Sequence, residues 1–285
     1  LSDCELNGTI PTTIGCLCNL ELLCLAGNPS TGSVPEEICR LPNLNELNLG
    51  WCELRGDVPS EIVCLQTLTK LNLADYPLAR CPTQLWKLTH LASLNLCRCD
   101  LQGNIPPEMG SLRNLKKLHL SSNCFTGPIP IELFQLTQLT HLFLGGWGDR
   151  AEVSLTGSMP TQLGQLTRLQ LLYISRTSQT GRIPTQLAQL TRLQQLTIRY
   201  TLQTGRIPTE IGRLTMLRYL SIWRTALIGA IPMEIKHLAK SLHFFALHFN
   251  GPLVEPIPLE VKQAFSGIRG KIFELCDLET PIRVM

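Results

Sequence analysis

The sequence lacks any long hydrophobic run. No stretch of the 285-residue chain approaches the roughly 18 consecutive apolar residues that a membrane-spanning helix needs, so the sequence predicts no membrane span. Aromatic residues are scarce, at 6%, while 44% of the residues are hydrophobic and 16% are charged. This balance excludes a disordered or collagen-like chain, because neither class carries enough hydrophobic residues for a packed core.

Catalytic signatures are also missing. The sequence has no Walker loop, no His-Glu-x-x-His pair, no Gly-x-Ser-x-Gly elbow and no kinase glycine loop. Phosphoryl transfer, zinc-dependent hydrolysis and acyl transfer depend on these local arrangements. The two Cys-x-Cys pairs, Cys16/Cys18 and Cys97/Cys99, do not have zinc-finger spacing. The sequence therefore predicts that the protein is not an enzyme and has no metal site and no cofactor.

Charge is unevenly distributed along the chain. Residues 1–100 carry 6 Lys and Arg against 11 Asp and Glu, residues 101–200 carry 9 against 4, and residues 201–285 carry 10 against 7. The basic residues are interspersed with acidic ones, unlike the dense basic tract of a nucleic-acid-binding arm. We therefore expect a polarised binding surface and no nucleic-acid partner.

A hydrophobic residue followed by proline recurs at nearly constant intervals. The pairs are Ile10-Pro11, Val34-Pro35, Val58-Pro59, Cys81-Pro82, Ile105-Pro106, Ile129-Pro130, Met159-Pro160, Ile183-Pro184, Ile207-Pro208, Ile231-Pro232 and Ile257-Pro258. Most steps are 24 residues long, and one step of 30 residues marks an insertion. A fixed period of this length is typical of a solenoid.

A second pattern, Leu-x-x-Leu-x-Leu-x-x-Asn, fills the space between these pairs. Its cleanest copy is Leu115, Leu118, Leu120 and Asn123. The Leu-x-Leu alternation predicts a short strand with one buried face. Because so short a strand is not stable alone, successive copies are expected to stack into a parallel sheet over one continuous core.

This repeat resembles the plant-type leucine-rich repeat of receptor-like kinases, receptor-like proteins, polygalacturonase inhibitors and some protist proteins. The resemblance covers residues 1–258 and implies a right-handed α/β solenoid of about eleven 24-residue repeats. It implies a parallel sheet on the concave face and 3₁₀ or irregular turns on the convex face. We expect an insertion at 145–156, and a degenerate last repeat or C-terminal cap at 259–285. Because the chain begins at Leu1, inside a repeat and without a signal peptide, we expect a fragment of a longer protein.

The last position of the Leu-x-x-Leu-x-Leu-x-x-Asn pattern is asparagine in a few copies and another residue in most of them. An inward-pointing Asn can satisfy buried backbone groups of the loop, and Cys52, Cys99 and Thr201 can fill that role in part. Tyr76 and Trp147 stand at the same position and are larger, so the loop is expected to deform around them.

The cysteines and the glycosylation signals bear on location. Eleven of the 12 cysteines precede residue 125, and their spacing indicates no pairing scheme. The resemblance implies paired flanking cysteines in extracellular members, which this sequence does not show, and only Asn7-Gly8-Thr9 is a glycosylation sequon. These observations favour reduced, buried thiols and a cytoplasmic location. An extracellular ectodomain is the alternative.

The concave face carries the candidate binding residues. In the last coils, the positions between and just after the strand leucines gather much of the scarce aromatic content beside three arginines. Tyr, Trp and Arg are the residue types that carry most binding energy at interfaces. We therefore predict a partner-binding patch made of Tyr173, Arg176, Arg199, Tyr200, Tyr219, Trp223, Arg224, Phe244 and His248.

The sequence favours a non-catalytic scaffold that binds a protein or peptide, with an acidic segment or a carboxylate facing the arginines. Two alternatives stay open. One is a ligand-sensing fragment of a larger receptor-like kinase or GTPase, which the adjoining sequence would reveal. The other is a secreted protein similar to polygalacturonase inhibitors, which a count of free thiols would test.

Overall fold

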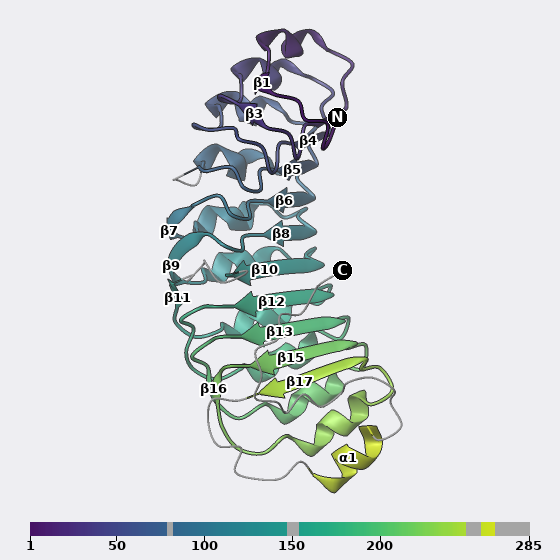
Figure 1. Cartoon of the computed structure of the whole chain (residues 1–285). Helices are drawn as coiled ribbons and strands as arrows, with labels where there is room; N and C mark the ends of the chain where they lie inside the picture. The colour runs from purple at the N-terminus through teal and green to yellow at the C-terminus, as the bar shows by residue number, and fades with distance from the viewer. Residues whose placement is uncertain (79–81, 147–153, 249–257, 266–285) are drawn as a thin grey trace.

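The chain forms a stack of similar coils. The computed structural model describes residues 1–78, 82–146, 154–248 and 258–265, and Figure 1 shows the coils following one another from the N-terminal end to helix α1. The expected solenoid is confirmed. Its main sheet has ten parallel strands, and each strand pairs with those of the preceding and following coils. In chain order they are β2 (Leu22–Cys24), β4 (Glu46–Asn48), β5 (Lys70–Asn72), β6 (Ser93–Asn95), β8 (Lys117–His119), β10 (His141–Gly145), β12 (Leu171–Ser175), β13 (Gln195–Arg199), β15 (Tyr219–Trp223) and β17 (Phe244–His248).

Short 3₁₀ helices cover the convex side. They are η1 (Thr12–Cys16), η2 (Glu36–Arg40), η3 (Ser60–Cys64), η4 (Thr83–Lys87), η5 (Pro107–Ser111), η6 (Ile131–Gln135), η7 (Thr161–Gln165), η8 (Thr185–Gln189), η9 (Thr209–Arg213) and η10 (Met233–Leu238). Each begins directly after the proline of a hydrophobic–proline pair. Proline fixes φ near the helical value and has no N–H to leave unsatisfied, so it is suited to the start of a helical turn.

A narrow ribbon of very short strands lies on one lateral side, between the main sheet and the 3₁₀ helices (Figure 1). Its members are β1 (Gly8–Thr9), β3 (Ser30–Thr31), β7 (Gln102–Asn104), β9 (Cys124–Pro128), β11 (Ser154–Thr156), β14 (Thr204–Gly205) and β16 (Ala226–Leu227). β11 pairs with β9 in parallel, so the chain resumes the regular coil at Ser154 after the insertion. Trp147 lies outside the described residues.

Helix α1 (Leu259–Phe265) follows Pro258, where a further convex turn would begin. Val261 and Phe265 are buried, and the Phe265 ring stacks on Phe245 with centroids 5.5 Å apart. This helix therefore packs on the last described coil. The eleventh repeat and the proposed boundary at residue 258 stay predictions, because residues 249–257 and 266–285 lie outside the described part. Within the described residues, no helix has the length and apolar character needed to cross a membrane.

The core is a ladder of leucines, as the repeat predicts. Leu47, Leu71, Leu94, Leu118, Leu142, Leu172, Leu196 and Leu220 are each at most 1% exposed. The strands pair so that these leucines lie opposite one another, for example Leu94 opposite Leu118 and Leu118 opposite Leu142. Each main-sheet strand from β4 to β15 begins one residue before its leucine of this ladder, and in β17 Phe245 takes the leucine's place.

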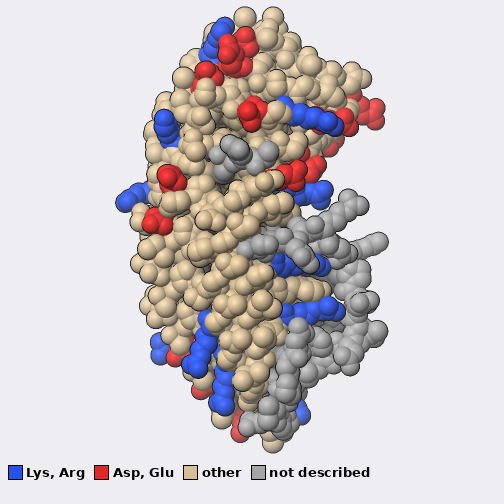
Figure 2. All heavy atoms as spheres, turned by 90° about the vertical axis from the view of Figure 1, so that its left-hand side faces the viewer, with Lys and Arg blue, Asp and Glu red and all other residues tan. Residues whose placement is uncertain are grey.

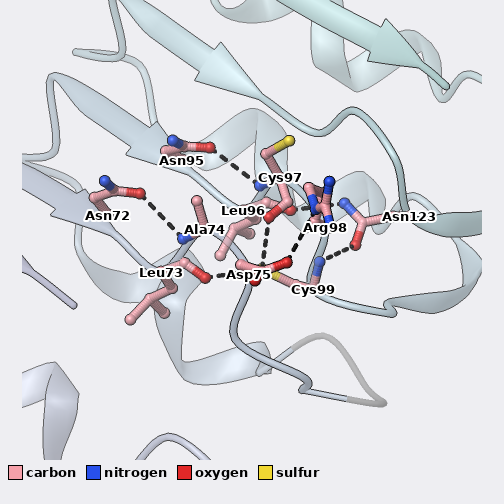
Figure 3. Close-up of polar contacts among 10 residues, drawn as sticks. All are labelled: Asn72, Leu73, Ala74, Asp75, Asn95, Leu96, Cys97, Arg98, Cys99 and Asn123. Atoms are coloured by element: carbon pink, nitrogen blue, oxygen red, sulfur yellow. Dashed lines mark hydrogen bonds and ion pairs between the residues drawn. The ribbon is translucent and has the colours of Figure 1, made fainter. Parts of the chain in front are cut away.

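The inward polar position satisfies the backbone of the neighbouring coil. The Asn123 amide oxygen accepts a hydrogen bond from the backbone N–H of Cys99 at 2.9 Å, and its Nδ2 donates to the Leu96 carbonyl at 2.7 Å (Figure 3). The same oxygen also accepts from the Leu101 N–H at 3.1 Å. Cys99 acts here as a donor, because its thiol donates to the Leu73 carbonyl at 3.0 Å, and its sulfur is a much weaker acceptor than an amide oxygen. Cysteine therefore replaces one half of what asparagine supplies.

Tyr76 fits this interior position in spite of its size. The side chain is 1% exposed, and its hydroxyl donates a hydrogen bond to the Arg55 carbonyl, at 3.3 Å, in the preceding coil. Burial raises the pKa of the Tyr76 phenol. The ring is thus part of the core, and its length carries the hydroxyl to the Arg55 carbonyl.

The fourth residue of each 3₁₀ helix controls the packing of neighbouring coils on the convex side. A Cβ added to Gly110 would lie 2.6 Å from the Glu132 carbonyl oxygen, and one added to Gly212 would lie 2.5 Å from that of Glu234. Trp86 occupies this position in η4, and η4 packs less closely on η5 than η5 packs on η6. A hollow of about 670 Å³, lined by residues of all three helices, lies beside Trp86. The size of this one side chain therefore sets the local spacing of the coils.

We predict that Leu118→Ala lowers the free energy of unfolding by about 2–5 kcal/mol. The side chain is fully buried in the middle of the leucine ladder, and the coils on either side leave little freedom to close the cavity. Chemical denaturation monitored by circular dichroism measures the change. Unchanged stability would contradict the assigned register.

We predict that Gly110→Ala destabilises the solenoid by at least about 1 kcal/mol, because the added methyl group overlaps a carbonyl oxygen. In an ordinary helix the same change stabilises by about 0.5–1 kcal/mol. Ala188 occupies the equivalent position of η8, so Ala188→Gly is the matched control and should have only the ordinary cost of glycine. Thermal unfolding of both variants checks the sign.

Candidate concave binding site

Three adjacent strands position the candidate residues. Ser175 at the end of β12, Arg199 at the end of β13 and Trp223 at the end of β15 are register partners in the parallel ladder. Strands in such a ladder lie about 4.8 Å apart. The sequence-predicted residues of these coils are therefore close neighbours on the concave side, and all of those with described side chains are partly buried there.

Three of the candidates face outward for a different reason from the one that the sequence suggests. Arg176, Tyr200 and Arg224 each follow the last residue of a strand, and strict strand alternation would turn them inward. Each instead adopts a left-handed backbone, with φ of 52°, 51° and 51°. This conformation is uncommon for residues other than glycine. It ends the strand and turns the side chain out beside its neighbours.

The Tyr200 ring lies between two guanidinium groups. The Cζ atom of Arg176 is 4.6 Å from the ring centroid, and that of Arg224, two coils further on, is 5.1 Å away. Both distances are typical of cation–π contacts. Trp223 meets the same ring edge-on, with centroids 4.8 Å apart. Four large side chains therefore hold one another in place.

Arg199 lies at the centre of the group. Its Nη2 donates a hydrogen bond to the Tyr173 hydroxyl at 3.2 Å, and its Cζ lies 5.5 Å from the Tyr173 ring centroid and 5.6 Å from that of Trp223. The Nε atom of Arg199 is buried and has no hydrogen-bond partner among the residues that the structure describes. The Tyr173 and Trp223 rings pack against this guanidinium and accept no conventional hydrogen bond from Nε, so the donor is left unsatisfied within the described part of the chain.

Tyr219 and Phe244 form a second aromatic contact at the end of the patch. Their rings are stacked, with centroids 4.3 Å apart and an angle of 7° between the planes. Burial raises the pKa of the Tyr219 phenol, and the nearby Arg199 cation opposes this effect. His248 pairs with Trp223 through the backbone ladder, and its side chain lies outside the described part.

Two aromatic side chains extend the patch beyond the predicted set. Phe143 and His119 occupy the Tyr173 position of the ladder, one and two coils earlier. The centroids of Phe143 and Tyr173 are 6.2 Å apart, and those of His119 and Phe143 are 4.5 Å apart. Burial lowers the pKa of His119 to about 4, so it is a neutral ring at neutral pH. Their position in the repeat could have identified both.

The coils that carry the patch are strongly basic. Residues 154–248 contain eleven Lys and Arg and only two Asp and Glu, and Glu210 and Glu234 lie in convex helices. The ion pairs of the described residues lie in earlier coils, such as Lys70–Glu46 at 2.8 Å and Arg98–Asp75 at 2.9 Å. Arg199 and Arg224 have aromatic rings as their described side-chain neighbours.

Sequence comparison identifies the repeat. A family model described as a leucine-rich repeat region matches residues 79–207, and a second one, described as a leucine-rich repeat, matches residues 19–41. Together they cover more than half of the chain. No curated protein matches the sequence.

Solved structures with the same fold include plant receptors. The Arabidopsis receptor kinase HAESA, in complex with the peptide hormone IDA and the co-receptor SERK1, is 26% identical, with a TM-score of 0.78 over 95% of this chain and 52% of that one. A TDR receptor is 28% identical, with a TM-score of 0.77 over 85% of this chain and 41% of that one. The plant peptide hormone receptor RGFR1, in complex with RGF2, is 30% identical, with a TM-score of 0.64 over 93% and 49%.

The chain thus spans about half or less of each of these receptor structures. Its 24-residue period, its inward leucine ladder and its proline-initiated convex turns are the features that it shares with the matched repeats. The chain belongs to the leucine-rich repeat family, and its neighbours place it among the plant-type members.

Proposed function

We propose that the chain is the ligand-recognition part of a receptor-type protein, without catalytic activity of its own, and that it binds an anionic peptide or protein segment. The late concave patch, made of Tyr173, Arg176, Arg199, Tyr200, Tyr219, Trp223, Arg224, Phe244 and His248, is the proposed site. The observation that carries the proposal is a cluster of guanidinium groups packed against aromatic rings, with Arg199 beside Tyr173 and Trp223 and with the Tyr200 ring between Arg176 and Arg224.

Charge favours an anionic ligand. Two cations about 10 Å apart repel each other by about 1.7 kcal/mol at the effective dielectric constant of about 20 near a protein surface, and an anion bound between them removes this repulsion. The same arginines act together on an incoming carboxylate, and the contact strengthens as water is displaced from between the groups. The bidentate geometry of a guanidinium matches a carboxylate, which is why an acidic side chain or a free C-terminus is the preferred partner.

The aromatic side chains supply the apolar part of the interface. Tyr200 and Trp223 are fixed by their mutual contacts before a ligand arrives, so little side-chain entropy is lost on binding. Phe143 and His119 continue the apolar surface toward the middle coils. An extended segment with apolar residues next to its acidic group would therefore fit this surface.

An extracellular location agrees best with the neighbours. HAESA was solved as a leucine-rich repeat ectodomain in complex with an N-terminally lengthened IDA peptide hormone, whereas the thiols and the single sequon of this chain favour the cytoplasm. We propose the extracellular alternative, in which this chain is part of a longer receptor. The ten described cysteines have no disulfide partners among the described residues. Thiol counting on the protein isolated from its native source tests this point.

We predict that Trp223→Ala weakens binding by about 1–2 kcal/mol, a five- to thirtyfold rise in Kd, while the melting temperature stays nearly unchanged. The probe is the tightest binder from a synthetic peptide library with free C-termini, measured by titration calorimetry. The same peptide with an amidated C-terminus tests the carboxylate. Equal affinity of the parent and the variant for the peptide would show that the binding site is not this patch.

We predict that Arg199→Glu slows association with the same peptide and flattens the dependence of the association rate on salt. The variant replaces the central cation of the patch with an anion that repels the ligand. Arg213→Glu, with the same charge change on convex helix η9, is the matched control and should alter the rate far less. Stopped-flow measurements at several salt concentrations separate the two variants, and identical rates would contradict the proposal.

A further inference from the structure

The lateral ribbon side of the solenoid has charges of opposite sign at its two ends. Figure 2 views this face and shows acidic side chains gathered mainly in its upper, N-terminal part, with basic side chains prevailing below. The sequence gives the same division. Residues 1–78 contain ten Asp and Glu against three Lys and Arg, whereas residues 154–248 contain two against eleven. The molecule is therefore an electrostatic dipole along the solenoid axis.

One position of the repeat shows this reversal residue by residue. The residue between the glycine and the hydrophobic–proline pair is Asp57 in the third coil, Arg182 in the eighth and Arg206 in the ninth. All three are exposed, and none takes part in an ion pair among the described residues. Glu53, four residues before Asp57, is exposed as well. The acids and the arginines thus occupy equivalent places on the same face, five to six coils apart.

The two arginines are held in parallel across this face. A Cβ added to Gly205 would lie 2.9 Å from Cγ of Arg182, and one added to Gly229 would lie 3.1 Å from Cγ of Arg206. Each arginine stem therefore lies across the glycine of the next coil. This packing fixes the stems and leaves the guanidinium groups in solvent.

Large apolar side chains are exposed beside these arginines. Leu202, in the loop before β14, is 55% exposed, and Ile228, directly after β16, is 52% exposed. The Ile228 N–H donates to the Gly205 carbonyl at 2.7 Å, so Ile228 lies beside the Arg206 segment. Leu202 precedes Arg206 by four residues in the same coil. Apolar side chains next to fixed arginines are the composition of a protein interface.

We infer that this lateral face pairs with the same face of a second copy of the chain, with the two solenoids antiparallel. A two-fold axis that reverses the coil order keeps each repeat position opposite its equivalent. It therefore places Glu53 and Asp57 of one copy against Arg182 and Arg206 of the other, and the contact occurs twice. The apolar Leu202 and Ile228 are covered in the same contact.

The charges select this arrangement over the parallel one. In a parallel pair the acidic ends would meet each other and the basic ends would meet each other, which is unfavourable at both ends. The antiparallel pair is favourable at both. It also closes on itself as a dimer, whereas a head-to-tail contact would continue into a fibre.

Sedimentation equilibrium of the chain tests the pairing. At about 0.01 M salt, where the Debye length is about 30 Å, we expect a salt-sensitive dimer, and at about 1 M salt, where the length is about 3 Å, we expect the monomer. A late variant, Arg182→Glu with Arg206→Glu, and an early variant, Glu53→Lys with Asp57→Lys, should each raise the dimer Kd at least about tenfold. Circular dichroism verifies that both variants fold.

An equimolar mixture of the two variants gives the decisive result. Each variant repels itself, but the late variant keeps the acids and the early variant keeps the arginines, so the mixed pair has opposite charges at both contacts. We expect the dimer to return in the mixture, with both variants present in it by mass spectrometry. A mixture that stays monomeric while the parent dimerises would overturn the antiparallel arrangement.

The control reverses two exposed cations of the ninth and tenth coils, Arg213→Glu in convex helix η9 and Lys240→Glu in the turn after η10. It changes net charge as much as the late variant does and should leave the dimer intact. A parent chain that is monomeric at low salt and about 100 μM would overturn the inference, since even a weak specific pair of Kd about 10 μM is then mostly associated. Equal loss of the dimer in the control and in the late variant would also overturn it.

Discussion

The parallel ladder of the main sheet is the constraint on which the molecule depends. Because each strand pairs in register with the next, residues at the same position of the repeat are stacked from coil to coil. The inward leucines become one continuous core, and no single coil could bury them alone. On every other face, equivalent repeat positions also stack from coil to coil into columns of side chains. The residues that occupy these columns determine the charge and polarity of the face.

The concave columns combine a strained backbone with the proposed binding patch. Arg176, Tyr200 and Arg224 hold left-handed conformations that cost on the order of 1 kcal/mol each, where glycine would cost little. The contacts around the Tyr200 ring offset part of this cost. The rings and guanidinium groups of this surface already contact one another in the chain alone. The surface is therefore organised without a partner.

The convex and lateral columns serve other purposes. On the convex side, close approach of carbonyl oxygens favours Gly110 and Gly212, while Trp86 separates two helices and opens a hollow. On the lateral side, the sign of the charge changes from Asp57 to Arg182 along one position. Because the solenoid is long and each coil contacts mainly its neighbours, these faces can differ without disturbing the core.

The sequence alone determined the repeat, the leucine core, the convex turns and the set of coils that carry the arginines and aromatic rings. These follow from a period of 24 residues, which needs only local spacing to be recognised. The tertiary structure decided how Arg176, Tyr200 and Arg224 face outward, because a left-handed residue ends each strand and strand alternation gives the wrong side. It also decided that His119 and Phe143 join the patch and that Tyr76 is buried, since ring contacts and burial arise only when one coil is stacked on the next.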